Sequence, residues 1–172
     1  MIPAGTYRLG PGNATLLVRT RRGGAAAKAG HDLLLHATAW EGTLTVGEDG
    51  EPAAAELAVD ATSLRVQAGT GGMKALDEAD KANIHQTIDD DVLERRDIAF
   101  RSTGVDGGRI EGELTLAGKT RPLALDLALS DDGGVSATAT VKQSDWGMKP
   151  YSALFGTLKV LDEVEVSLQG HV

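Results

Sequence analysis

The sequence predicts an all-β fold: an eight-stranded antiparallel β-barrel with one short helix over an end. Two observations predict it, namely apolar residues that alternate with polar ones in many short runs and glycine-rich turns between those runs. A period of two is typical of strands that bury one face. Short turns join strands that are antiparallel neighbours. The 172 residues show no linker-like change in composition, so we expect a single domain over residues 1–172.

The clearest predicted strand is residues 123–129, where leucine occupies every odd position and the even positions are Ala124, Asp126 and Ala128. The same alternation recurs in residues 14–18, 33–39, 55–59, 98–100, 110–116, 135–141 and 164–168. Sheets with one buried face close on themselves or pair face to face, because open edges invite aggregation. An eight-stranded barrel has an interior that is filled by side chains or holds one small ligand.

Small residues at the predicted inward positions bear on that choice. These residues are Ala37, Ala39, Ala55, Gly112, Ala137 and Ala139. They either leave room for a ligand or let the walls pack closely against each other or against the helix. Both interpretations stay open on the sequence alone.

Residues 80–93 interrupt the β pattern and predict the helix. Ile84, Ile88 and Val92 recur at a spacing of four with polar residues between them, which is typical of a helix with one apolar face. Asp80 is the expected N-cap, and the glycine-rich residues 69–72 before it suggest a mobile flap. A second break, residues 149–156, predicts a short helical turn at most.

Composition excludes several partners. A formal net charge of −8 repels nucleic-acid phosphates, so we expect no nucleic-acid partner. The absence of cysteine excludes disulfides and thiolate metal sites. No run approaches the roughly 20 apolar residues of a membrane-spanning helix, and the first residues lack a signal-peptide pattern, so we expect a cytoplasmic location and no membrane span. A homodimer is left open.

Four segments carry a family resemblance: GHDL at residues 30–33, VDATSL at 59–64, FRST at 100–103 and GELTLAGKTRP at 112–122. In this order they resemble the YceI-like family of lipocalin-like β-barrel proteins, which bind polyisoprenoids or other long amphiphilic chains. The resemblance implies an extended barrel with a helix over one end, an elongated apolar tunnel and no catalytic residues. The chain departs from the family in having few aromatic residues, and it has LERRD at 93–97 where the family often has an aromatic-Pro pair. The fold is therefore carried over, and the ligand's identity is not.

The candidate ligand-binding residues are His31, Leu33, Leu35, Leu57, Phe100, Leu114, Leu125, Trp146, Tyr151 and Phe155. We expect the ligand's tail among the leucines and Phe100. The resemblance places the histidine that matches His31 near the ligand's head group. The aromatic cluster of Trp146, Tyr151 and Phe155 is expected either to form a lid in which Tyr151 meets a polar head, or to plug the core.

Candidates for chemistry are few. His31 and His36 are five positions apart, and residues an odd number of positions apart point to opposite faces of a strand. We interpret His31 and Asp32 as hydrogen-bonding groups that fix the start of their strand. His85 and His171 lack ligand partners at a recognisable spacing, so we expect neither a metal site nor a cofactor. The acidic residues 89–91 and 94 are interpreted as solvated surface.

We therefore expect non-enzymatic binding, carriage or storage of an apolar ligand such as a polyisoprenoid, an isoprenoid quinone or a fatty-acid-like chain. One alternative is an enzyme acting on a small hydrophobic substrate, with His31 or His36 as base and Tyr151 as acid. It predicts an inward ionisable group with a perturbed pKa. The other is a filled barrel that acts as an acidic interaction or stress-associated protein, which a cavity smaller than a few hundred Å³ would favour.

Overall fold

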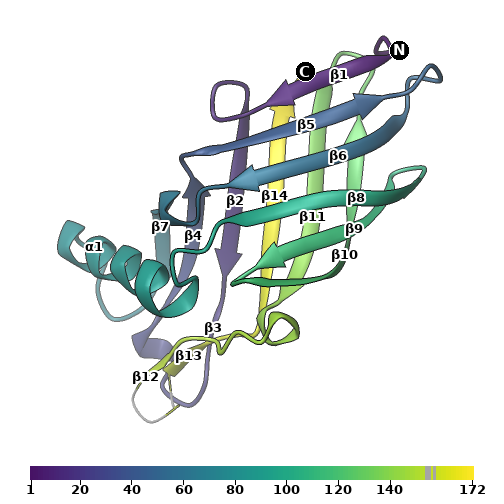
Figure 1. Ribbon diagram of the computed structural model, residues 1–172. Helices are drawn as coiled ribbons and strands as arrows, with labels where there is room; N and C mark the ends of the chain where they lie inside the picture. Colours follow the sequence, from purple (N-terminus) through teal and green to yellow (C-terminus); the bar gives the residue numbers. More distant parts are fainter. Residues whose placement is uncertain (154–155, 157) are drawn as a thin grey trace.

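A computed structural model describes residues 1–153, 156 and 158–172 of the chain (Figure 1). An 11-stranded antiparallel sheet in the order β1-β5-β6-β8-β9-β10-β11-β14-β2-β4-β7 curls into a half-barrel. The prediction of an antiparallel all-β fold with one helix is confirmed. The prediction of a closed eight-stranded barrel is wrong, because β1 and β7 end the sheet without pairing with each other.

The strands of this sheet are β1 (Gly5–Leu9), β2 (Ala14–Thr20), β4 (His31–Ala37), β5 (Trp40–Val46), β6 (Pro52–Val59), β7 (Leu64–Gly71), β8 (Ile98–Asp106), β9 (Arg109–Leu116), β10 (Lys119–Leu129), β11 (Gly134–Lys142) and β14 (Glu163–His171). Seven of the eight predicted runs fall within one strand each, in β2, β6, β8, β9, β10, β11 and β14, and the eighth, residues 33–39, starts in β4 and ends two residues beyond it. The sequence interpretation missed β1, β5 and β7. In β5 the alternation is nonetheless clear, because Trp40, Gly42, Leu44 and Val46 are buried and the residues between them are not.

Two corners explain the missed strands β5 and β7. The chain bends between β4 and β5 at Thr38 and Ala39, and between β6 and β7 at the 3-10 turn η2 (Ala61–Ser63). The two bends stay bonded to each other, because Thr38 N–H donates to the Ser63 carbonyl and Asp60 N–H to the Ala39 carbonyl, both at 3.0 Å. The chain therefore forms two long bent strands, β4 with β5 and β6 with β7. They pair as β5–β6 near one edge of the sheet and as β4–β7 at the other, and this pairing holds the sheet curled.

The hairpin between β9 and β10 confirms a predicted turn. Leu116 pairs with Lys119, and the two residues between them, Ala117 and Gly118, have φ of 51° and 77°. Two successive positive φ values define the tight turn whose twist matches that of the flanking strands, and glycine adopts such values without strain. The register of the longest hairpin in the sheet is set here.

The helix begins earlier than predicted. Residues Glu78–Thr87 form α1, and its N-cap is Asp77 rather than Asp80. Asp77 accepts a hydrogen bond from Asp80 N–H at 2.7 Å, and the Asp80 carboxylate accepts one from Asp77 N–H at 3.1 Å. This reciprocal capping box satisfies two amide groups that no helical carbonyl reaches. Both aspartates can cap a helix by residue type. Only with Asp77 as the N-cap does the other aspartate, Asp80, occupy the third helical position that the capping box requires.

A π-helical turn, η3 (Ile88–Val92), continues α1, with Leu93 N–H donating to the Ile88 carbonyl at 2.8 Å. Figure 1 shows α1 at one end of the half-barrel, away from both termini. A small sheet of β3 (Arg22–Gly23), β12 (Ser152–Ala153) and β13 (Leu158–Val160) lies at this end as well. Residues 152–153 are therefore strand, where a helical turn was predicted, and the 3-10 turn η4 (Gln143–Trp146) lies just upstream.

A candidate ligand-binding cavity

A cavity of about 500 Å³ lies inside the half-barrel. Inward side chains of the main sheet, α1 and η3 form its wall. Ligand pockets commonly measure roughly 300–1,000 Å³. The interior is thus hollow, which counts against the filled-barrel alternative.

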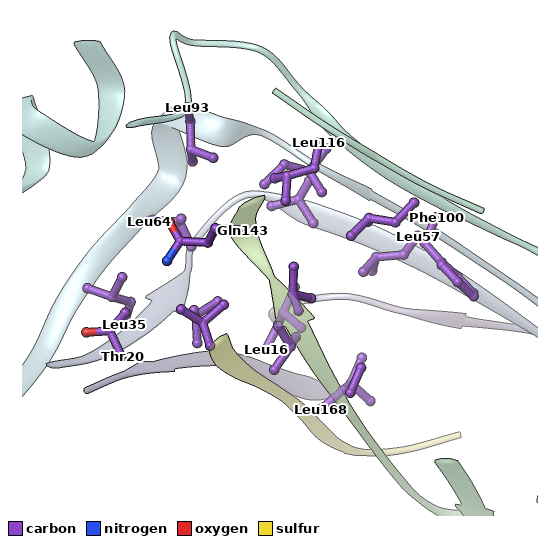
Figure 2. A pocket seen from close by; sticks show the side chains of 18 of the residues that line it. Leu16, Thr20, Leu35, Leu57, Leu64, Leu93, Phe100, Leu116, Gln143 and Leu168 are labelled. Carbon is purple, nitrogen blue, oxygen red and sulfur yellow. The ribbon is translucent and has the colours of Figure 1, made fainter. Parts of the chain in front are cut away.

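The wall is mainly aliphatic, because successive inward positions of the strands carry leucine, valine or alanine. Figure 2 shows several of these side chains, with Leu16 and Leu168 facing Leu57 and Phe100 across the cavity. The aliphatic wall residues of the sheet include Leu16, Val18, Leu33, Leu35, Leu57, Leu114, Leu116, Leu123, Leu125, Val141, Val164, Val166 and Leu168. Period-two alternation thus supplies the cavity wall directly.

The small inward residues have different roles. Ala55, Ala137 and Ala139 line the cavity as predicted. At Gly112 a Cβ would collide with the Phe100 ring and the Arg101 carbonyl, so this glycine makes room for the ring instead. Ala37 is buried in the core, and the inward position predicted for Ala39 is wrong because it is exposed at the corner after β4.

The helical segment closes one end of the cavity. Ile84, Ile88 and Val92, the predicted apolar face, all line it, together with Leu93. Polar contacts hold the opposite face, with His85 Nε2 3.1 Å from the Asp89 carboxylate and 3.0 Å from the Thr62 carbonyl. Asp89 is only 5% exposed. The interpretation of the acidic run as solvated surface is therefore wrong at this residue, because Asp89 lies four positions after His85 and contacts it.

A polar rim borders the cavity near the small sheet and consists of Arg22, His31, Tyr151 and Lys159. His31 Nε2 hydrogen-bonds to the Lys74 carbonyl at 2.7 Å. The Arg22 guanidinium donates to the Gly30 carbonyl at 2.8 Å and the Thr70 carbonyl at 3.0 Å. Asp32 accepts from Arg22 N–H at 2.8 Å, which confirms the predicted role of Asp32 at the start of its strand.

Most predicted site residues come together at this cavity. His31, Leu33, Leu35, Leu57, Phe100, Leu114, Leu125 and Tyr151 all line it. Trp146 lies in the core as a plug, 3% exposed, because its Nε1 donates to the Leu114 carbonyl at 2.9 Å and fixes the ring against β9. Phe155 lies outside the described residues. Leu33, Leu57 and Leu125 come from strands far apart in sequence, so the curl of the sheet alone brings them together.

Among the polar wall residues that sequence reasoning missed, Thr20 and Gln143 are buried. Thr20 continues the alternation of Leu16 and Val18, so its inward position was readable from the pattern. Gln143 carried no such signal, because it belongs to the turn η4 rather than to a strand.

Ionisable groups with a lowered pKa lie away from the cavity wall. Hydrogen bonds lower the pKa of four aspartates. The Thr62 hydroxyl donates to Asp60 and the Asp80 amide to Asp77. The Ser130 hydroxyl donates to Asp132 and the Ser144 hydroxyl to Asp162. These carboxylates stabilise turns and caps. His36 lies on the face of β4 opposite His31 and Leu35, as predicted.

Over the residues that the structure describes, histidine, aspartate and glutamate form no group of three that could hold a metal ion. No helix in the same residues is long and apolar enough to cross a membrane.

The fold and the cavity define a class of protein: antiparallel β proteins that curl one sheet around an apolar chamber and cover one end with a helix. The family profile described as the YceI-like domain matches residues 18–172. The chain belongs to the YceI-like family. No curated protein sequence matches it.

Solved structures show the same fold. The crystal structure of Burkholderia cenocepacia BcnA matches with a TM-score of 0.62 and 15% identity, over 91% of this chain and 94% of that one. The crystal structure of a mutant CJ YCEI protein with a monobromobimane guest matches with a TM-score of 0.58 and 13% identity, over 80% of this chain and 82% of that one. At these identities the likeness is one of fold.

Proposed function

We propose that the chain binds an apolar ligand inside the half-barrel for carriage or storage, and that it is not an enzyme. The ligand class is a polyisoprenoid, an isoprenoid quinone or a fatty-acid-like chain. The observation that carries the proposal is the cavity of about 500 Å³ with its mainly aliphatic wall. Each Å² of apolar ligand surface removed from water contributes about 25 cal/mol, so a long hydrocarbon chain gains ample free energy there.

The polar rim gives the ligand a direction. Arg22, His31 and Lys159 bring basic side chains to one end of the cavity in a chain whose formal net charge is −8. A polar head at this rim keeps contact with polar groups and water, while the tail extends toward Leu57 and Phe100. Tyr151 is 47% exposed and offers a further hydroxyl to such a head.

The arrangement of histidines argues against catalysis. A general base must reach the proton that it abstracts. His31 Nε2 donates to the Lys74 carbonyl, which leaves Nδ1 as the one ring nitrogen of His31 that could act as a base, and His36 belongs to the other face of β4. The mutant CJ YCEI protein, which has the same fold, holds a monobromobimane guest.

One pair of variants tests the proposal. Ala137 lines the cavity, whereas Ala128 is exposed on β10. Ala137→Phe fills cavity space, and Ala128→Phe makes the same chemical change outside it. We expect Ala137→Phe to weaken binding of the neutral apolar dye N-phenyl-1-naphthylamine at least about tenfold, and Ala128→Phe to bind like the wild type. Fluorescence titration measures both affinities.

Protein purified from its own host provides the second readout. Native mass spectrometry followed by organic extraction should find a long-chain lipid bound to the wild type and to Ala128→Phe, but not to Ala137→Phe. Wild-type protein that carries no lipid over several preparations and does not bind the dye would overturn the proposal.

A further inference from the structure

We propose that the cavity contains a specific subsite for an uncharged oxygen of the ligand, a hydroxyl or a carbonyl, formed by Thr20 and Gln143. The inference rests on the proposed function and adds a chemical requirement to it. A purely aliphatic wall would accept any hydrocarbon of suitable size. Two buried polar groups on that wall select ligands that can hydrogen-bond to them.

Thr20 is the first of these groups. It ends β2, pairs with Leu33 of β4 and points inward like Leu16 and Val18. Thr20 as a whole is 8% exposed, and its Oγ1 is buried with no hydrogen-bond partner among the described residues. Buried hydroxyl groups almost always have a partner, because burial without one costs free energy. A ligand oxygen in the cavity provides that partner.

Gln143 is the second group, and its amide is held in one orientation. The side chain is 6% exposed and lines the cavity, and its Nε2 donates to the Leu161 carbonyl at 3.2 Å. Only the amide nitrogen can donate to a carbonyl, which assigns the other amide atom as the acceptor Oε1. Within the described part of the chain no hydrogen bond reaches Oε1, so it remains an acceptor for a ligand.

Backbone contacts bring the two groups to one region of the wall. Leu161, whose carbonyl holds Gln143, donates its N–H at 2.8 Å to the carbonyl of Arg21, the residue next to Thr20. Figure 2 shows Thr20 and Gln143 on the same side of the cavity as Leu35 and Leu64. Leu57 and Phe100 lie further along, which leaves room for the tail.

The donor and acceptor pattern decides the class of ligand group. A ligand hydroxyl can accept from Thr20 O–H or donate to Gln143 Oε1, so it can satisfy either protein group. A carbonyl accepts from Thr20. A carboxylate would face the lone pairs of Oε1 and be repelled, which favours an alcohol, a ketone or a quinone over a fatty acid at this position.

The test compares three ligands that share a ten-carbon chain: decane, decan-1-ol and decanoate, each displacing N-phenyl-1-naphthylamine. The variants are Thr20→Val, which keeps the shape and removes the hydroxyl, and Thr20→Ser, which keeps the hydroxyl. Thr15→Val is the matched control, because Thr15 is exposed on the same strand. The unfolding midpoint of each variant verifies that it folds.

We expect Thr20→Val to weaken decan-1-ol about 3- to 10-fold, the usual effect of one hydrogen bond. Its affinity for decane should stay within about twofold of the wild type, while Thr20→Ser and Thr15→Val retain the wild-type preference for the alcohol. If decane and the dye bind but Thr20→Val leaves the alcohol unaffected, the subsite is overturned and the proposed function stands. A larger loss for decanoate than for decan-1-ol also overturns it. If no ligand and no dye binds the wild type, both proposals fail.

Discussion

The two tryptophans form a natural comparison at the residue scale. Trp40 and Trp146 are 7% and 3% exposed, and both belong to the hydrophobic core. The Nε1 of Trp146 donates to the Leu114 carbonyl, whereas the buried Nε1 of Trp40 has no partner in the part of the chain that the structure describes. Both rings contribute apolar burial, and only one contributes a hydrogen bond.

Trp146→Phe should therefore destabilise the protein more than Trp40→Phe does. Each substitution removes the same pyrrole portion of the indole, so the cavity contribution is similar. The additional loss at Trp146 is about 0.5–1.5 kcal/mol, the net value of one buried hydrogen bond. Urea unfolding followed by circular dichroism gives both free energies, and equal losses would contradict a stabilising role for the contact with Leu114.

Single residues also mark how far the sequence could predict the site. The inward leucines were readable because alternation alone decides which face of a strand is buried. The role of Trp146 depends on a carbonyl 32 positions away in sequence, and that of Gly112 on the ring of Phe100 across a strand pair. Contacts of this kind follow from the pairing register, and a single sequence does not reveal that register.

At the scale of the elements, the helix is the segment whose boundaries were hardest to place. Asp77 and Asp80 are equally good caps by residue type, and their reciprocal hydrogen bonds decide in favour of Asp77. The π-helical turn after α1 had no counterpart in the spacing of Ile84, Ile88 and Val92. Strands were easier to predict until a corner interrupted their alternation, as it does after Ala37 and Val59.

Removing the cap should loosen the helical cover of the cavity. No residue of α1 is fully buried, so local hydrogen bonds contribute much of its order. Asp77→Ala should reduce the hydrogen-exchange protection of residues 78–87 roughly fivefold, a common effect of a lost N-cap. The control Glu78→Ala removes a carboxylate from the same turn without removing the capping box.

Exchange rates measured by mass spectrometry in the absence of ligand should separate the two variants. If Asp77→Ala and Glu78→Ala lose protection equally, the local charge and not the capping box orders α1. The sheet strands serve as an internal reference, because their amide groups are bonded in the ladder.

At the scale of the whole molecule, acid should destabilise the fold. Asp60, Asp77, Asp132 and Asp162 have a pKa below the usual 3.8, because hydroxyl or amide groups donate to their ionised form in the folded chain. A pKa lowered by folding stabilises the folded state above the unfolded pKa and ceases to do so as the pH falls through the folded pKa. The stabilisation by these groups is complete at neutral pH.

We expect the free energy of unfolding to change little between about pH 7 and pH 5 and to fall below about pH 4, where the unfolded carboxyls take up protons. Asp162→Asn should flatten part of this decline, because its partner Ser144 then bonds to a group that does not titrate. Asp106→Asn, at the end of β8, serves as the control. Urea unfolding at each pH provides the measurement, and an Asp162→Asn variant that is as acid-sensitive as Asp106→Asn would contradict the assignment.

The architecture as a whole was only partly predictable. Alternation and turns identify antiparallel strands, but they do not state whether the last strand pairs with the first. In this chain the two bonded corners already join the ends of the sheet, through Thr38 with Ser63 and Asp60 with Ala39. A ladder between β1 and β7 is therefore unnecessary for the sheet to stay curled.

The cavity wall is made of the same inward side chains that fold the sheet. A protein that binds through surface loops can exchange those loops while its core stays intact. Here a mutation that reshapes the chamber for a new ligand also alters the packing of Leu57, Leu114 or Leu125, and so changes stability in the same step. Ligand specificity in this chain should thus evolve slowly, through compensated pairs of substitutions on facing strands.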